Sequence, residues 1–115
     1  MHEMSLIQSL LNIVEEHSVT HGFKKVNSMK LSFGRMNHIE PGSLEFAFNV
    51  QSRGTKAEGA TLEFEIFPVV IHCFRCSKDF EVDRFEFTSC PKCRMGEVKV
   101  IGGTEDLRLI EMEVD

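Results

Sequence analysis

The sequence predicts an α+β fold in which two helices pack on one face of a three-stranded sheet and a cysteine-bearing lobe is inserted before the last strand. Three observations predict it. Two segments repeat apolar residues every three or four positions, three segments alternate apolar and polar residues, and the stretch 71–101 is rich in Cys, Lys, Arg and Glu. Both helices must cover the same face of the sheet if all apolar stripes are to be buried together.

The two helices are expected on either side of the first strand. The first runs from Met4 to just before Gly22, and its apolar face is formed by Met4, Ile7, Leu10, Leu11 and Val14. The second begins at Pro41, which suits a first helical turn, and extends to Arg53, just before Gly54. Its apolar face contains Leu44, Ala47 and Phe48. Each helix therefore offers one stripe for burial.

The three strands are expected at Lys25–Phe33, Thr61–Phe67 and Asp106–Val114. The alternation of the last strand slips at Leu109–Ile110, which indicates a bulge. We expect a right-handed parallel crossover between the first two strands, although an edge placement stays open. The insert returns to the last strand through Gly102-Gly103, which either forms a hinge or simply begins that strand.

Charge and length restrict the class of protein. The 115 residues suit one domain with a small appendage, and 13 basic against 18 acidic side chains give a net charge of −5. The excess acid lies in the second half, which makes nucleic-acid binding through a broad basic face unfavourable. No apolar run has the length of a membrane span, and the Met-His-Glu start lacks the positive region of a signal peptide. We expect a cytoplasmic chain, in which paired cysteines are metal ligands or redox groups rather than structural disulfides.

The insert carries two Cys-x-x-Cys pairs, Cys73-Cys76 and Cys90-Cys93. Each pair has the spacing at which both thiolates of a tight turn reach one ion, and four thiolates complete the tetrahedral shell of structural Zn²⁺. A lobe of about thirty residues has little core of its own, so metal binding would supply its stability. The apolar residues expected to cover the site are Phe80, Val82, Phe85 and Phe87.

Other chemistries stay open for this insert. Either pair has the spacing of a thiol–disulfide site, although such a site usually opens a helix in a βαβ unit. Iron fits the same four-sulfur shell as zinc. His72 adjoins Cys73 and either replaces a thiolate, orients one, or has no role in the site.

The amino terminus offers a different set of donors. A histidine at position 2 should prevent removal of Met1, which leaves a free amine next to the amides of His2 and Glu3 and the His2 imidazole. Four such nitrogens in a plane suit Ni²⁺ or Cu²⁺ but not Zn²⁺. The same residues also fit a frayed polar start before a helix. His17 and His21 have a spacing that can bind metal on a helix, but a solvated polar face is the favoured explanation for them.

Taken together, these features resemble the HypA/HybF family of hydrogenase nickel-incorporation proteins. The resemblance extends along the whole chain and includes the Met-His-Glu start directly before a helix, the CxxC…CPxC insert, Phe33-Gly34, Leu44–Phe48 and Gly59–Leu62. It implies a nickel metallochaperone rather than an enzyme. It also implies a nickel-binding α+β domain made of residues 1–70 and 102–115, with a zinc-binding lobe at 71–101.

The family's nickel site falls on Met1 through its amine, on His2 through its imidazole and amide, and on Glu3 as a backbone or neighbouring contributor. The resemblance implies Ni(II) as transferred cargo there, and Zn(II) as a structural ion on Cys73, Cys76, Cys90 and Cys93. Some members have a histidine after each cysteine pair, whereas Ser77-Lys78 and Arg94-Met95 stand in this chain. A switch that exchanges histidine for cysteine on zinc therefore lacks support here.

The resemblance also implies the partners. These are a HypB-type nickel GTPase and the large subunit of a [NiFe]-hydrogenase, with urease maturation proteins as a further client in some organisms. We expect a monomer or a weak homodimer with no nucleic-acid or membrane partner.

Two rival functions have different sequence support. A thiol oxidoreductase would use a Cys-x-x-Cys pair. A zinc-ribbon adaptor would use a lobe face made of Arg75, Lys78, Arg84, Lys92 and Arg94 with Phe74, Phe80, Phe85 and Phe87. No nucleophile elbow or phosphate-cradling glycine loop indicates an enzyme.

Overall fold

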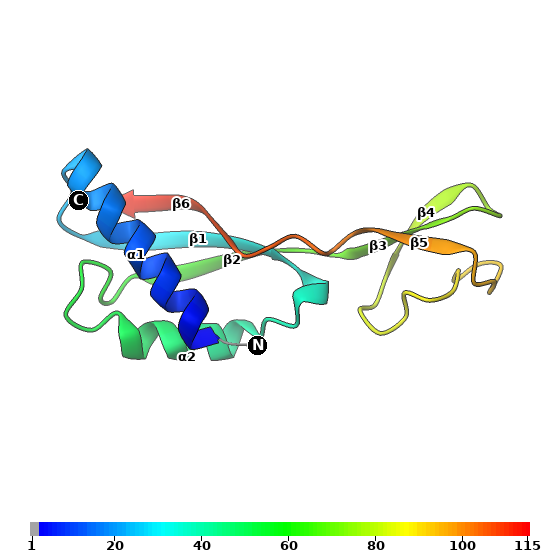
Figure 1. Cartoon of the computed structure of the whole chain (residues 1–115), viewed down its shortest axis with the longest axis horizontal. Coiled ribbons are helices and arrows are strands. Elements are labelled where there is room, and N and C mark those ends of the chain that lie inside the picture. Colours follow the sequence, from blue (N-terminus) through cyan, green and yellow to red (C-terminus); the bar gives the residue numbers. More distant parts are fainter. Residues whose placement is uncertain (1–2) are drawn as a thin grey trace.

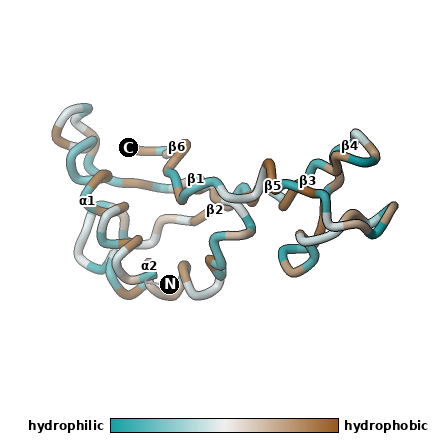
Figure 2. Tube along the Cα trace, turned by 45° about the vertical axis from the view of Figure 1, so that its right-hand side comes forward, coloured by the Kyte–Doolittle hydropathy of each residue, from teal (hydrophilic) through white to brown (hydrophobic). Residues whose placement is uncertain are grey.

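The computed structural model describes residues 3–115 and is elongated, with principal extents of 54 × 24 × 17 Å. A three-stranded sheet lies at each end, and both helices lie beside the first sheet (Figure 1). Hydrophobic segments occur at both ends of the molecule (Figure 2), so each sheet has apolar residues to bury. This architecture confirms the α+β fold. The elements in chain order are α1 (Glu3–His21), β1 (Val26–Gly34), a 3₁₀ turn η1 (Arg35–Asn37), α2 (Pro41–Gln51), β2 (Thr61–Phe67), β3 (Val69–Cys73), β4 (Lys78–Val82), β5 (Val98–Gly102) and β6 (Arg108–Val114).

The first sheet has the strand order β2-β1-β6. The pairing of β1 with β2 is parallel, with α2 in the connection between them, and the pairing of β1 with β6 is antiparallel. Lys30 pairs with Glu111 while its neighbour Leu31 pairs with Leu109, so Ile110 is an extra residue in β6. The parallel crossover and the bulge expected from the sequence are both confirmed.

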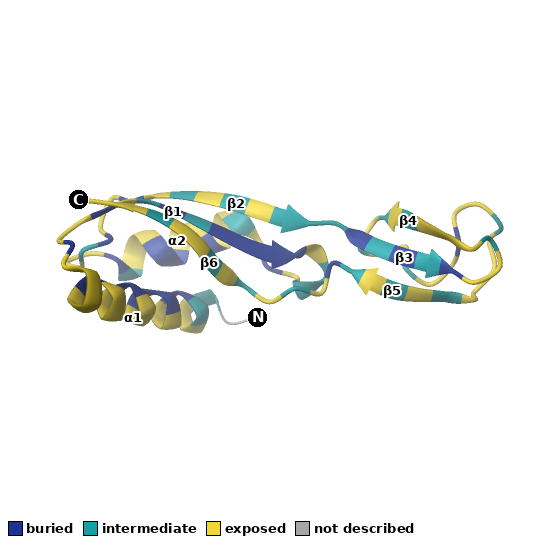
Figure 3. Cartoon of the chain, turned by 90° about the horizontal axis from the view of Figure 1, so that it is seen from above, coloured by how far each residue is buried: buried dark blue, intermediate teal, exposed yellow. Residues whose placement is uncertain are grey.

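Both helices lie on the same side of the first sheet, with α1 next to the β6 edge (Figure 1, Figure 3). The core between helices and sheet is continuous, and its buried members from α1, β1 and α2 are Ile7, Leu10, Leu11, Val14, Met29, Leu31, Phe33, Leu44, Ala47 and Phe48. The apolar faces expected for both helices contribute to this core, except that Met4 is exposed. The other face of the sheet is polar, as in the row Glu63, Lys30 and Glu111.

The helix ends follow local backbone chemistry. α1 ends at His21, and the next residue, Gly22, has a φ of 74°, the left-handed conformation that commonly terminates helices. α2 ends at Gln51 rather than at Arg53; Ser52 caps it by donating the last helical hydrogen bond to the carbonyl of Phe48, and the chain then turns through Gly54, which has a φ of 78°. The 3₁₀ turn was not predicted.

The second sheet contains the cysteine insert and has the order β4-β3-β5, with both pairings antiparallel. Its three short strands were not predicted from the sequence. Its buried apolar residues are few, namely Val69, Ile71, Cys73 and Cys90. Phe80 pairs with Ile71 across the sheet, but Phe85 is 71% exposed, so the expectation that it helps to cover the cysteines is wrong.

Two chain segments connect the sheets, and they touch at Gly103. Gly103 has a φ of 96° and is buried, and a Cβ placed on it would lie 2.7 Å from the Val69 Cα. A Cβ on Gly34 would lie 2.2 Å from the carbonyl oxygen of Gly103. Gly102 is the last residue of β5, so the Gly102-Gly103 pair does not begin β6. The structure gives Gly103 a packing role, because only glycine permits such close backbone contact.

Candidate metal centre

The four cysteines of the insert converge. Their sulfur atoms all lie within 4.8 Å of one another, and the structure contains no other group of three or more potential metal-ligating side chains among residues 3–115. The Sγ atoms of Cys73 and Cys93 are 3.7 Å apart, and those of Cys76 and Cys90 are 3.8 Å apart. A tetrahedral shell with Zn–S bonds of about 2.3 Å has sulfur–sulfur edges of about 3.8 Å. The donor set therefore fits zinc or another ion that prefers four thiolates.

Each cysteine pair sits in a tight turn that directs backbone N–H groups at sulfur. In the first turn, at the end of β3, the N–H of Cys76 donates to the Cys73 sulfur over 3.4 Å. In the second, the N–H groups of Lys92 and Cys93 donate to the Cys90 sulfur over 3.3 and 3.4 Å. These bonds favour the thiolate form, since a backbone donor stabilises negative charge on its acceptor.

The residue after each pair has a left-handed backbone. Ser77 has a φ of 55° and Arg94 has a φ of 61°, and the N–H of Arg94 bonds to the carbonyl of Cys90 over 2.9 Å. This conformation turns the chain away so that both sulfurs of a pair face the same point. No sequence signal indicated it, because glycine is the usual residue for such a backbone and neither position has one.

The thiols of Cys76 and Cys90 differ in acidity. Burial, reinforced by the neighbouring thiols, raises the pKa of Cys76 to about 12. Burial also opposes ionisation of Cys90, but the backbone N–H groups of Cys93 and Lys92 outweigh it and lower the pKa of this thiol to about 6. Cys90 is therefore the more acidic of these two thiols, and a bound divalent cation favours ionisation of all four.

His72 points away from this centre. Its Nδ1 lies 2.7 Å from a carboxylate oxygen of Asp79 on the paired strand β4, and its ring meets the Phe74 ring edge to face. Cys73, the next residue, is buried while His72 is partly exposed, as expected for neighbours on opposite faces of a strand. The cluster of four potential ligands does not include His72.

The residues predicted to bind nickel are only partly within the described chain. Met1 and His2 lie outside it, and Glu3 is a half-buried residue in the first turn of α1. His17 and His21 stack with ring centroids 5.4 Å apart on the exposed side of α1, and His38 is an exposed residue with a φ of 56°. None of these three histidines belongs to the metal-ligating cluster.

Comparison with known proteins decides the family. Residues 1–114 match the sequence profile of a family described as hydrogenase/urease nickel incorporation, metallochaperone, HypA. The chain belongs to the HypA family. Among HypA relatives, the hydrogenase maturation factor of Syntrophus aciditrophicus is 48% identical over 115 residues, and that of Acidithiobacillus ferrooxidans is 39% identical over 115 residues. Both alignments cover all of both chains.

Solved HypA structures share the fold. The solution structure of the nickel metallochaperone HypA from Helicobacter pylori matches with a TM-score of 0.63 and 24% identity, covering 99% of this chain and 97% of that one. A second HypA solution structure matches with a TM-score of 0.67 and 24% identity, covering 99% and 96%. The resemblance noted in the sequence is confirmed. The HypA family is one of nickel metallochaperones for hydrogenase maturation, and the four-cysteine cluster of this chain is suited to a metal such as zinc.

Proposed function

We propose that this chain binds Ni²⁺ at its amino terminus and delivers it to the large subunit of a [NiFe]-hydrogenase, without catalysing a reaction itself. The nickel donors are the Met1 amine, the His2 imidazole and amide, and a backbone contribution from Glu3. Nickel is the cargo, and zinc on Cys73, Cys76, Cys90 and Cys93 is structural. The observation that carries the proposal is the match to a nickel-incorporation family along residues 1–114, which includes the Met-His-Glu start.

The structure around the start of α1 supports placing the nickel site at the amino terminus. α1 begins at Glu3, the third of the proposed nickel-site residues. The Gln51 side-chain amide donates to the Met4 carbonyl over 2.8 Å, which fixes the start of α1 to the end of α2. Glu3, the proposed nickel-site residue that the structure describes, thus belongs to the nickel-binding domain that we assign to residues 1–70 and 102–115.

The structural role of zinc rests on the small core of the lobe at 71–101. Two of the four buried apolar residues of the second sheet and its turns are cysteines, Cys73 and Cys90. A lobe with so little buried surface gains its stability from the metal, because the ligands come together only when the chain is folded. Four protein ligands also complete a tetrahedral shell, which leaves no position for a reacting water.

The chemistry of the terminal site suits transfer. Protonation of the amine and imidazole removes donors one after another, so nickel affinity falls as the pH falls. Copper binds such nitrogens more tightly than nickel, so selection of nickel depends on docked partners and low free copper. We propose a HypB-type GTPase as the nickel donor, with hydrogenase as the main client and urease maturation as a second. We place this work in the cytoplasm, where reducing conditions keep the thiols available to zinc.

Calorimetric nickel titration of the tag-free, zinc-loaded chain tests the proposal. We expect one equivalent of Ni²⁺ and a visible absorption band of square-planar nickel. Both are lost in His2→Ala and in a chain whose Met1 amine is acetylated, while zinc content stays constant. His17→Ala is the matched control and binds nickel as the unchanged protein does. Unchanged nickel binding in the two terminal variants would contradict the proposal.

A zinc-ribbon adaptor is the second candidate, favoured by exposed aromatic residues on the lobe. Phe74 is 60% exposed and Phe85 is 71% exposed, with the Arg84 guanidinium 4.9 Å from the centre of the Phe85 ring. Residues 71–101 hold six basic and five acidic side chains, which is a weak charge for binding nucleic acid. Salt-dependent oligonucleotide binding that Phe85→Ala removes, together with absence of nickel binding, would support the adaptor instead.

A further inference from the structure

The outer edge of β6 is open. β6 pairs with β1 on one side, and among residues 3–115 no strand pairs with it on the other. The outward N–H and C=O groups of such a strand are a template for another strand. The molecule therefore offers a place where an extended segment can add to the first sheet.

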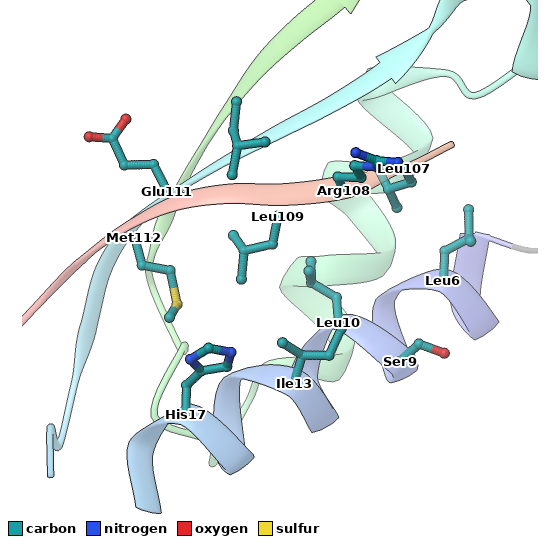
Figure 4. Close-up of a pocket in the computed structure, with 11 residues that line it drawn as sticks. Leu6, Ser9, Leu10, Ile13, His17, Leu107, Arg108, Leu109, Glu111 and Met112 are labelled. Carbon is teal, nitrogen blue, oxygen red and sulfur yellow. The ribbon is translucent and has the colours of Figure 1, made fainter. Parts of the chain in front are cut away.

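An apolar groove runs along this open edge. Its volume is about 510 Å³, and it lies between α1 and the segment that contains β6. In Figure 4, Leu10 and Ile13 on α1 point toward Leu109 and Met112 on β6. The residues that line the groove are mostly apolar, and two of them remain largely exposed, Ile13 at 41% and Ile110 at 46%. A strand added to β6 would place alternate side chains over this apolar surface.

The charges beside the groove indicate which kind of segment binds there. The segment 106–115 contains four acidic residues and one basic residue, Arg108. Glu111 and Glu113 pair with Lys30 and Ser28 on the polar face of the sheet, opposite the face that α1 covers. The outward side chains of an added strand would lie next to these carboxylates, since directly opposed residues are about 5 Å apart. Lysine or arginine suits those positions.

A second copy of this chain fits the edge poorly. Pairing of β6 with another β6 would bring two acidic segments together, and like charges opposite each other destabilise a sheet. The occupant must therefore differ from this chain in charge.

We propose that the groove between α1 and the open edge of β6 binds an extended segment of a partner protein in which apolar and basic side chains alternate. The apolar side chains enter the groove over α1, and the basic ones lie beside Glu111 and Glu113. This docking surface goes beyond nickel binding and uses none of the proposed metal ligands.

A peptide-binding experiment tests the proposal. The probe is a fluorescent synthetic peptide of nine alternating valines and lysines, and the control peptide has glutamates in place of the lysines. At physiological salt we expect the lysine peptide to bind at least tenfold more tightly than the glutamate peptide. Its binding should also slow amide hydrogen exchange in β6. Ile13→Glu should weaken binding of the lysine peptide at least tenfold.

Val19→Glu is the matched control, because Val19 is 78% exposed on the same helix and does not line the groove. It adds the same charge and should leave peptide binding unchanged. Equal binding by the Ile13→Glu and Val19→Glu variants, or no slowing of exchange in β6, would overturn the proposal. So would a dimer of the chain alone that Ile13→Glu dissociates. Nickel titration of Ile13→Glu should match that of the unchanged protein, so failure of this proposal is distinguishable from failure of the nickel proposal.

Discussion

Replacing Gly34 with alanine should destabilise the protein through steric contact alone. Gly34 has φ −86° and ψ 144°, which any residue adopts, so the substitution creates no backbone strain by itself. Its new Cβ would lie 2.2 Å from the Gly103 oxygen, 2.3 Å from the Gly103 carbonyl carbon and 2.6 Å from the Glu105 nitrogen. All three are backbone atoms, which cannot rotate away as a side chain can.

The magnitude follows from the contacts that must separate. Relief of the clash requires the β1 end and the segment after β5 to move apart by about 1 Å, and overpacking of this kind costs about 1–3 kcal/mol. The same movement breaks or lengthens two hydrogen bonds of 2.8 Å, from Gly34 N–H to the Glu105 carbonyl and from Met36 N–H to the Gly103 carbonyl. Each contributes about 1 kcal/mol. We expect Gly34→Ala to lower the free energy of unfolding by about 3–5 kcal/mol.

Urea unfolding of the zinc-loaded protein, followed by far-UV circular dichroism, measures this change in a chain that lacks Trp and Tyr. Gly42→Ala is the matched control, because Gly42 is exposed in α2 and an added Cβ meets nothing within 4 Å. It should stabilise the protein by up to about 1 kcal/mol, since alanine favours helix over glycine. A Gly34→Ala variant within about 0.5 kcal/mol of the unchanged protein would refute the packing role of this glycine contact.

Three further predictions concern the lobe and the core. Removal of the bound metal with a chelator should speed amide hydrogen exchange in residues 69–102 and leave the exchange rates of α1 unchanged. Slow exchange that persists in the lobe would contradict a structural role for the metal. Arg94→Gly should stabilise the metal-loaded lobe by about 1 kcal/mol because the left-handed backbone favours glycine, and slower metal loss to a chelator would measure it. Phe48→Ala should lower the free energy of unfolding, measured in urea, by about 3–5 kcal/mol because Phe48 is 1% exposed. Phe46 is 71% exposed, so Phe46→Ala should change the free energy of unfolding by less than about 0.5 kcal/mol. Similar losses in the two variants would contradict the assigned core.

Local periodicity predicted the helices and the first sheet because burial on one face determines their sequence. The stripe that includes Ile7 and Val14 identified α1, and the phase slip at Leu109–Ile110 identified the bulge. The parallel pairing of β1 and β2 followed from the intervening helix. These features depend on neighbours in the chain, which a single sequence displays.

The remaining features depend on contacts between distant residues. Strands β3, β4 and β5 have only five residues each, too few for the alternation of apolar and polar residues to identify them. The converging cysteines bring the ends of these strands together. The contact of Gly34 with Gly103 and the groove between α1 and β6 both depend on how separate segments pack. The cysteine spacing did predict the convergence of the four thiols, because the ligand geometry is encoded in two short motifs.

Transfer of nickel to its client tests the central claim most directly. The nickel-loaded chain is mixed with a purified, nickel-free large subunit of [NiFe]-hydrogenase in the presence of a chelator that captures free nickel, and the metal in the separated subunit is measured. We predict that the unchanged chain delivers nickel and that His2→Ala, with its zinc intact, does not. Equal nickel in the subunit with both proteins, or none with either, would contradict the account.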